Sequence, residues 1–209
     1  MNKKKIIQST LNYYDSKLLN FGNNYKGMSW SSKKSQYLRF NELVKIGSIK
    51  NKSIHDVGCG NGELLNYLIK NKIIFSNYLG SDISDKMINI ANNNFNYLKN
   101  IKFEKSNLLE NANHSKYDYV LASGIFNIKN NFSNKKWIKY VFEMIEKMFY
   151  FSKIGTGFNM LTFDVDYKEK KLFYMSLDKL VSFIRLNLSK KIVINHSYNL
   201  WEFTIFIYK

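Results

Sequence analysis

The chain has 209 residues, of which 45% are hydrophobic, so it can form one α/β core and is too short for a second full domain. Its longest apolar runs fall short of the about 20 residues that cross a bilayer, and its basic N-terminus lacks the apolar stretch of a signal peptide. We therefore expect a cytoplasmic protein without a transmembrane segment. The single cysteine, Cys59, excludes an internal disulfide and a cysteine-based metal cage, and we expect no metal site.

The formal net charge of +16 is compatible with binding to nucleic acid or an anionic membrane. However, Arg39 and Arg185 are the only arginines, and the lysines are scattered along the chain rather than clustered. Abundant Lys, Asn, Ile, Tyr and Phe without any proline is the composition expected of an AT-rich coding sequence. We therefore expect no stable nucleic-acid partner, although a general attraction to polyanionic substrates remains.

Residues 1–33 are polar and irregular, and we expect them to cap a site, with 34–209 as the core of a single domain, 1–209. The predicted helices and strands then alternate along the chain, as helix 34–46, strand 53–57, helix 61–70, strand 78–82, helix 84–98, strands 101–104 and 117–122, helix 136–151, strand 157–163 and helix 176–186. Two β-rich runs at the end, 191–195 and 200–208, predict an antiparallel hairpin at the sheet edge. This order is typical of an α/β fold with a doubly wound, mostly parallel, seven-stranded sheet and helices on both faces.

Three glycines at every second position, Gly58, Gly60 and Gly62, follow the first predicted strand and precede a helix. A dinucleotide fingerprint has its third glycine three residues after the second, where this chain has Glu63. A carboxylate in the first turn of that helix would repel a pyrophosphate, but it is well placed beside a cation. The spacing therefore favours a cofactor with a sulfonium group and an amino-acid tail.

A second acidic residue, Asp82, closes the next predicted strand, 24 residues after Gly58. A carboxylate at this place can accept hydrogen bonds from both ribose hydroxyls of a nucleotide cofactor. The alternative is that Asp82 is the N-cap of the helix that starts near Ser84. The glycine turn upstream favours the ribose interpretation.

These residues resemble motif I and the following acidic position of class I S-adenosylmethionine-dependent methyltransferases. Asp56, Gly58, Gly60 and Gly62 match the family's D-x-G-x-G-x-G, and Asp82 matches its ribose-binding carboxylate. The resemblance implies a Rossmann-like methyltransferase fold, S-adenosyl-L-methionine as cofactor and S-adenosyl-L-homocysteine as product. It also implies that Ile83 packs on the adenine and that Asn107 lies beside the adenine amino group, where many members have Asp. Further cofactor contacts are expected from Cys59, Asn61, Leu108, Ser123 and Trp30.

A wider similarity extends over nearly the whole chain, to small bacterial methyltransferases associated with capsule and surface-polysaccharide biosynthesis. The segments that carry it are 13–18, 27–31, 36–40, 122–127, 157–162 and 198–204. One activity in that group methylates the phosphoramidate decoration of Campylobacter-type capsules. The resemblance thus implies an O-methyltransferase acting on a small anionic or nucleotide-linked glycan precursor, with phosphoramidate O-methylation as one form of it.

Methyl transfer needs a protein base only if the acceptor must lose a proton. His196, in the predicted terminal loop, is the candidate base, and the alternative is an exposed turn histidine. His55 lies in a core strand and is expected to be structural, whereas His114 lies in a polar loop outside the site. Asp118 is expected to cap backbone at the entry of its strand.

Several side chains are candidates for substrate contact near the mouth of the site. The aromatic ones can wall a pocket, although any single aromatic residue is more often part of the core. The two asparagines among them would orient the acceptor. The candidates are Tyr14, Phe126, Asn127, Asn159, Tyr198 and Trp201. Arg39 has a planar guanidinium that suits the methionine carboxylate of the cofactor, the alternative being a surface helix cation.

Other functions remain open at this point. A sugar-hydroxyl O-methyltransferase has the same sequence requirements. Amino-methylating nucleic-acid enzymes commonly carry an Asn/Asp-Pro-Pro-aromatic turn after the fourth strand, where this chain has 123–126, Ser-Gly-Ile-Phe. A catalytically silent cofactor-binding module is disfavoured by the intact glycines and Asp82. The sequence specifies no oligomeric state.

Overall fold

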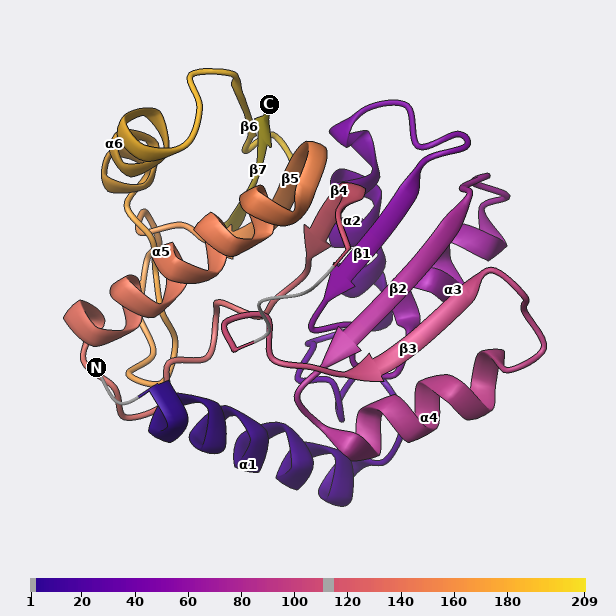
Figure 1. Ribbon diagram of the computed structural model, residues 1–209. Coiled ribbons are helices and arrows are strands. Elements are labelled where there is room, and N and C mark those ends of the chain that lie inside the picture. Colours follow the sequence, from indigo (N-terminus) through magenta and orange to yellow (C-terminus); the bar gives the residue numbers. More distant parts are fainter. Residues whose placement is uncertain (1–2, 111–114) are drawn as a thin grey trace.

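The computed structural model describes residues 3–110 and 115–209 (Figure 1). Its centre is a seven-stranded sheet in the order β3-β2-β1-β4-β5-β7-β6. The strands are β1 (Ser53–Val57), β2 (Asn77–Asp82), β3 (Ile101–Lys105), β4 (Tyr117–Ala122), β5 (Ser152–Leu161), β6 (Ile192–Asn195) and β7 (Glu202–Tyr208). The first five strands are parallel, and β7 pairs antiparallel with both β5 and β6. The predicted sheet, including its antiparallel end, is confirmed.

Helices cover both faces of the sheet, as predicted (Figure 1). They are α1 (Lys3–Phe21), α2 (Lys33–Leu43) with the 3₁₀ turn Val44–Ile46, α3 (Glu63–Lys70), α4 (Asp85–Phe95), α5 (Asn134–Phe151) and α6 (Leu177–Asn187). The strand order reverses between β1 and β4, so right-handed crossovers place α3 and α4 on one face and α5 and α6 on the other. None of the helices in the described part of the chain is both long and apolar enough to span a membrane.

Strand β4 shows how the sheet separates two apolar cores. Tyr119 and Leu121 pack in the core beneath α2, α3 and α4, whereas Val120 and Ala122 pack in the core beneath α5 and α6. The alternation follows from the two-residue repeat of a strand. Where β1 and β4 lie side by side, neighbouring crossovers leave on opposite faces, and this opens a crevice at the carboxyl ends of the strands.

The N-terminal segment differs from the prediction, because residues predicted to be irregular form the 19-residue helix α1. Ile6 is the only buried residue of this helix. The helix therefore lacks the stripe of apolar residues by which an amphipathic helix is predicted from sequence. Polar contacts hold it instead, with Lys3 Nζ 2.7 Å from Glu143 Oε2 and Ser84 Oγ donating to Asp15 Oδ1 at 2.7 Å. The helix was therefore missed because its partners are distant in sequence and polar.

Candidate cofactor site

A cavity of about 1050 Å³, counting its open mouth, lies at the carboxyl ends of the central strands. Helix α1 crosses this end of the sheet (Figure 1). Most of the predicted cofactor residues line the cavity, namely Trp30, Asp56, Gly58, Cys59, Gly60, Asn61, Asp82, Ile83, Asn107, Leu108 and Ser123. Tyr14, predicted to contact substrate, lines it as well. Six separate segments of the chain therefore meet at this cavity.

The glycine turn after β1 needs glycines for steric reasons. Gly58 has φ +71°, and its N–H donates to Ser81 O at 2.7 Å, which ties the turn to β2. A Cβ at Gly58 would collide with Ile125 Cγ2. Gly62 does not line the cavity; it is the N-cap of α3, with φ +86° and no side-chain cap. The N-cap of α3 therefore offers its first amides no side-chain acceptor, and Glu63, the first residue of the helix, lines the cavity.

Asp82 connects the turn after β1 with the turn after β2. Its Oδ2 accepts the Gly60 N–H at 3.0 Å, and its Oδ1 accepts the Ser84 N–H at 2.9 Å. The N-cap of α4 is Ser84 and not Asp82, so the alternative interpretation of Asp82 as the cap is wrong. Burial raises the pKa of Asp82, against the effect of these N–H donors. The carboxylate still lines the cavity, with lone pairs available to two hydroxyls.

Two further polar side chains in the cavity have informative partners. Asp56 Oδ2 accepts the Tyr78 hydroxyl at 2.6 Å, and burial raises the pKa of Asp56 to about 7. Asn107 Oδ1 accepts the Leu109 N–H at 3.1 Å, whereas its Nδ2 is buried without a hydrogen-bond partner in the described chain. Asn107 therefore presents a donor to the cavity. A donor suits a ring nitrogen of adenine rather than its amino group.

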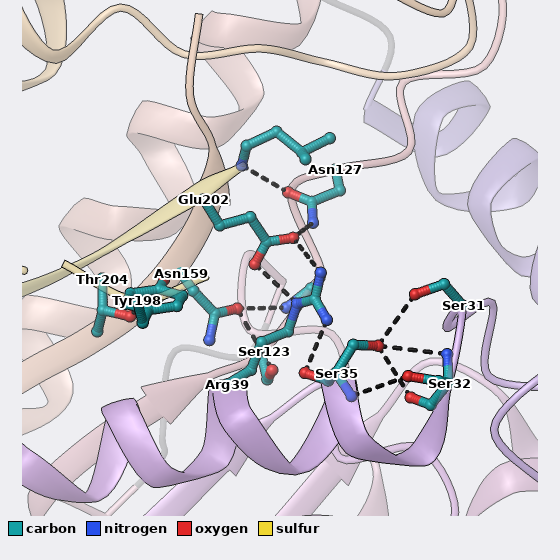
Figure 2. A network of polar contacts seen from close by, with 12 residues as sticks. Ser31, Ser32, Ser35, Arg39, Ser123, Asn127, Asn159, Tyr198, Glu202 and Thr204 are labelled. Atoms are coloured by element: carbon teal, nitrogen blue, oxygen red, sulfur yellow. Dashed lines mark hydrogen bonds and ion pairs between the residues drawn. The ribbon is translucent and has the colours of Figure 1, made fainter. Parts of the chain in front are cut away.

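Arg39 does not line the cavity, so the expectation that it receives the methionine carboxylate is wrong. Its Nε and Nη2 donate to the two carboxylate oxygens of Glu202 at 2.8 and 2.7 Å, and its Nη1 donates to Ser35 O at 2.8 Å (Figure 2). Its guanidinium also stacks 4.5 Å from the ring centre of Trp30. Arg39 is 8% exposed and Glu202 1%, so this is a buried ion pair. Glu202 is the only acidic residue in the apolar run at the end of the chain. An isolated acid in such a run indicates a buried partner of opposite charge, and the sequence prediction for Arg39 did not take it into account.

Asn127 and Asn159 hold the loop that follows β4 rather than lining the cavity (Figure 2). Asn127 Nδ2 donates to Glu202 Oε1 at 3.1 Å, and its Oδ1 accepts the Leu161 N–H at 3.3 Å. Asn159 Oδ1 accepts the Gly124 N–H at 3.1 Å and the Ser123 hydroxyl at 3.3 Å. Asn159 thus fixes the cavity wall at Ser123, whereas Asn127 ties the loop after β4 to β5 and β7.

The other predicted substrate residues also lie outside the cavity lining. Phe126 is fully buried, edge-to-face with Phe158, and the Tyr198 hydroxyl lies 2.9 Å from Thr204 Oγ1. Trp201 is 55% exposed. His196, the predicted base, is exposed, and its ring centre lies 6.3 Å from that of Phe203.

The position of β7 explains these differences. The loop that leads into β7 lies beyond β5, and β7 is three strands from β1 and two strands from β4. At about 4.8 Å per strand, this separates the loop from the cavity. His114 lies outside the described residues. The structural roles expected for two other residues are confirmed, because His55 Nε2 lies 2.8 Å from Ser81 Oγ in the core and Asp118 accepts the Ser53 N–H at 2.8 Å.

The charges and hydroxyls of the cavity indicate what it can bind. Among the described residues, its lining contains three carboxylates, Asp56, Glu63 and Asp82, and no Lys, Arg or His. Burial raises the pKa of Tyr140 to about 12, with a contribution from the charge of Asp82, and burial also raises the pKa of Tyr14. Both phenols therefore stay protonated at neutral pH. A nucleoside with a cationic amino-acid tail fits this set of groups: Asp82 for a ribose, Asn107 for a base and carboxylates for the cation.

Comparison with known proteins identifies the family. A family model described as a methyltransferase domain matches residues 48–191. A Mycobacterium tuberculosis protein named as a methyltransferase, Rv1506c, is 31% identical over 159 residues, which cover 75% of this chain and 93% of that protein.

Two solved structures with S-adenosylhomocysteine share the fold. Magnesium protoporphyrin IX methyltransferase from Synechocystis PCC 6803 gives a TM-score of 0.70 at 13% identity over all of both chains. The N-methyltransferase NodS from Bradyrhizobium japonicum WM9 gives 0.66 at 10% identity, over 95% of this chain and 97% of NodS. The chain therefore belongs to the methyltransferase-domain family and is a class I S-adenosylmethionine-dependent methyltransferase.

Proposed function

We propose that the enzyme methylates a hydroxyl oxygen of a small sugar-containing precursor in surface-polysaccharide biosynthesis. The observation that carries this proposal is the composition of the cavity wall, which in the described chain has hydroxyl and carboxylate groups but no basic side chain. The segments with the capsule-type resemblance also supply Tyr14, Trp30 and Ser123 to this wall. A neutral hydroxyl meets no electrostatic penalty there.

An anionic acceptor group fits this wall less well. A phosphoramidate or phosphate oxygen inside the cavity would face Asp56, Glu63 and Asp82 without a cationic contact from the described lining. Lys33, the nearby cation, is already 3.0 Å from Glu63 Oε2. A nucleotide-linked precursor is compatible with the wall if its sugar enters and its phosphates stay at the mouth. The net charge of +16 then favours the encounter with such a precursor.

The main contribution of the protein to methyl transfer is to align the acceptor oxygen with the methyl group. Bound S-adenosylmethionine supplies a methyl group activated by its sulfonium. The C–O bond forms as the C–S bond breaks, and the acceptor hydroxyl gives its proton to solvent. Tyr14 and Tyr140 line the cavity and stay protonated, so they orient the acceptor rather than deprotonate it. Holding the two reactants in line supplies much of the rate.

A methyl-transfer screen with mass detection tests the proposal. The acceptors are sugar nucleotides, free monosaccharides, cytidine-linked phosphoramidates and tRNA, each with S-adenosylmethionine. We expect one methyl group on a sugar hydroxyl, abolished in Asp82→Ala. The matched control is Trp201→Ala, because this exposed residue is outside the cavity lining and its loss should leave the rate unchanged. Transfer only to the phosphoramidate oxygen, or only to tRNA, would contradict the proposed acceptor.

A further inference from the structure

Gln36 lines the cavity from helix α2. It lies in the first turns of α2, after the capping box that Ser32 and Ser35 form. Its side chain lines the cavity, yet the residue is only 2% exposed. Arg39 follows three residues later on the same helix, and its bond to Glu202 fixes α2 against β7. Gln36 is therefore held in place by a helix that is anchored to the sheet.

The carbonyl oxygen of Gln36 has an unmet hydrogen-bonding requirement. Oε1 is buried and has no hydrogen-bond partner among the described residues. Buried polar atoms in native proteins are nearly always paired, and an exception calls for an explanation. Because Gln36 lines the cavity, the missing partner is best supplied by a donor group of the bound ligand.

The position of Gln36 along the cavity selects the part of the ligand that it meets. Asn107 follows β3 and Asp82 ends β2, so these residues mark the nucleoside end. Helix α2 lies toward the opposite end, where Lys33 reaches Glu63 of α3 at 3.0 Å and Arg39 reaches Glu202 of β7. A ligand with its nucleoside over β2 and β3 thus extends its amino-acid tail toward Gln36.

We propose that Gln36 Oε1 accepts a hydrogen bond from the α-ammonium group of the methionine moiety of the cofactor. A carbonyl oxygen matches an N–H donor and would repel the carboxylate of the same tail. Glu63, in the cavity lining, adds a negative potential that favours the same cation. The inference rests on the cofactor and is independent of the acceptor proposed above.

Calorimetric titration with three ligands tests this contact without any acceptor. The ligands are S-adenosylhomocysteine, its desamino analogue and 5′-methylthioadenosine, which lacks the whole amino-acid tail. Gln36→Met keeps the length of the side chain but removes the carbonyl oxygen. We expect it to weaken S-adenosylhomocysteine about tenfold, the size of one charge-assisted hydrogen bond, and to leave the other two ligands within about twofold.

Gln36→Glu is the conservative variant, because it keeps an acceptor at this position, and it should retain the wild-type preference for S-adenosylhomocysteine over the desamino analogue. An equal loss for both ligands in Gln36→Met would show a merely structural role and overturn the proposal, as would no loss at all. Asp82→Ala is the separate control for the nucleoside end, expected to weaken all three ligands. If the wild type bound none of them, the cofactor assignment itself would fall, which is distinguishable from a failure at Gln36 alone.

Discussion

At the scale of single residues, Asp56, in the cavity lining, makes the stability of the fold depend on pH. Its pKa of about 7 is raised by burial, whereas in the unfolded chain an aspartate has a pKa of about 3.9. Between these values the folded protein retains a proton that the unfolded chain has lost. The stability that this group contributes is therefore fully present below pH of about 4 and is lost as the pH rises through about 7.

Asp56→Asn should remove this dependence, because an amide does not titrate. Urea unfolding at several pH values between 5 and 8 measures it. The wild type should lose stability toward pH 7 with a slope of up to about 1.4 kcal/mol per pH unit from this group, and the variant should show a shallower slope. Parallel profiles of wild type and variant would rule out Asp56 as the source. Asp82, whose pKa burial also raises, contributes with the same sign in both proteins.

At the scale of elements, α1 covers the cavity with few apolar contacts of its own. Ile6 is its one buried residue, and the rest of its attachment is polar, such as the Tyr13 hydroxyl 2.7 Å from Ser29 Oγ and Asn130 Nδ2 donating to Ser9 Oγ at 3.0 Å. Segments held in this way open at low free energy. Thr10, Leu11 and Tyr14 line the cavity, so a bound ligand adds contacts to α1.

Hydrogen exchange should therefore respond to ligand most strongly in α1. At S-adenosylhomocysteine concentrations of a hundred times its Kd, the α1 amides should exchange up to about a hundredfold more slowly. Amides of α6, which contributes no residue to the cavity, are the internal control and should change much less. Mass spectrometry of peptic fragments measures both. Equal protection of α1 and α6 would argue against a ligand-stabilised cover.

At the scale of the whole molecule, the Arg39–Glu202 pair joins α2 to the antiparallel end of the sheet, across a separation of 163 residues. Leaving one buried charge without its partner is costly, so Arg39→Met or Glu202→Leu alone should lower the free energy of unfolding by about 3–5 kcal/mol. The double variant should regain most of that loss, because no buried charge remains. Denaturant unfolding of the three variants measures this cycle. Single variants within about 1 kcal/mol of the wild type would contradict it.

The sequence predicted the features that depend on neighbouring residues, such as turns and strands. It did not predict the features that depend on partners far away in the chain. Gly58 and Gly62 predicted the turn because its left-handed backbone conformation is a local requirement for glycine. The pattern of apolar residues predicted all seven strands. Arg39 looked available to a ligand because nothing near it in sequence shows that Glu202 neutralises it. Phe126 and His196 were placed by analogy at the mouth, and only the position of β7 in the sheet decides which side chains reach it. Helix α1 was not predicted because polar contacts hold it in place, and such contacts produce no periodic pattern of apolar residues in the sequence.

The cover formed by α1 also has a consequence for turnover. Its side chains and the glycine turn line the same cavity, so spent S-adenosylhomocysteine cannot leave over that side until the Lys3–Glu143 and Asp15–Ser84 contacts separate. If product leaves on the side of α1, each catalytic cycle includes one detachment and one reattachment of this 19-residue helix. On that route the rate of the movement would set an upper limit on kcat, whatever the speed of the methyl transfer itself.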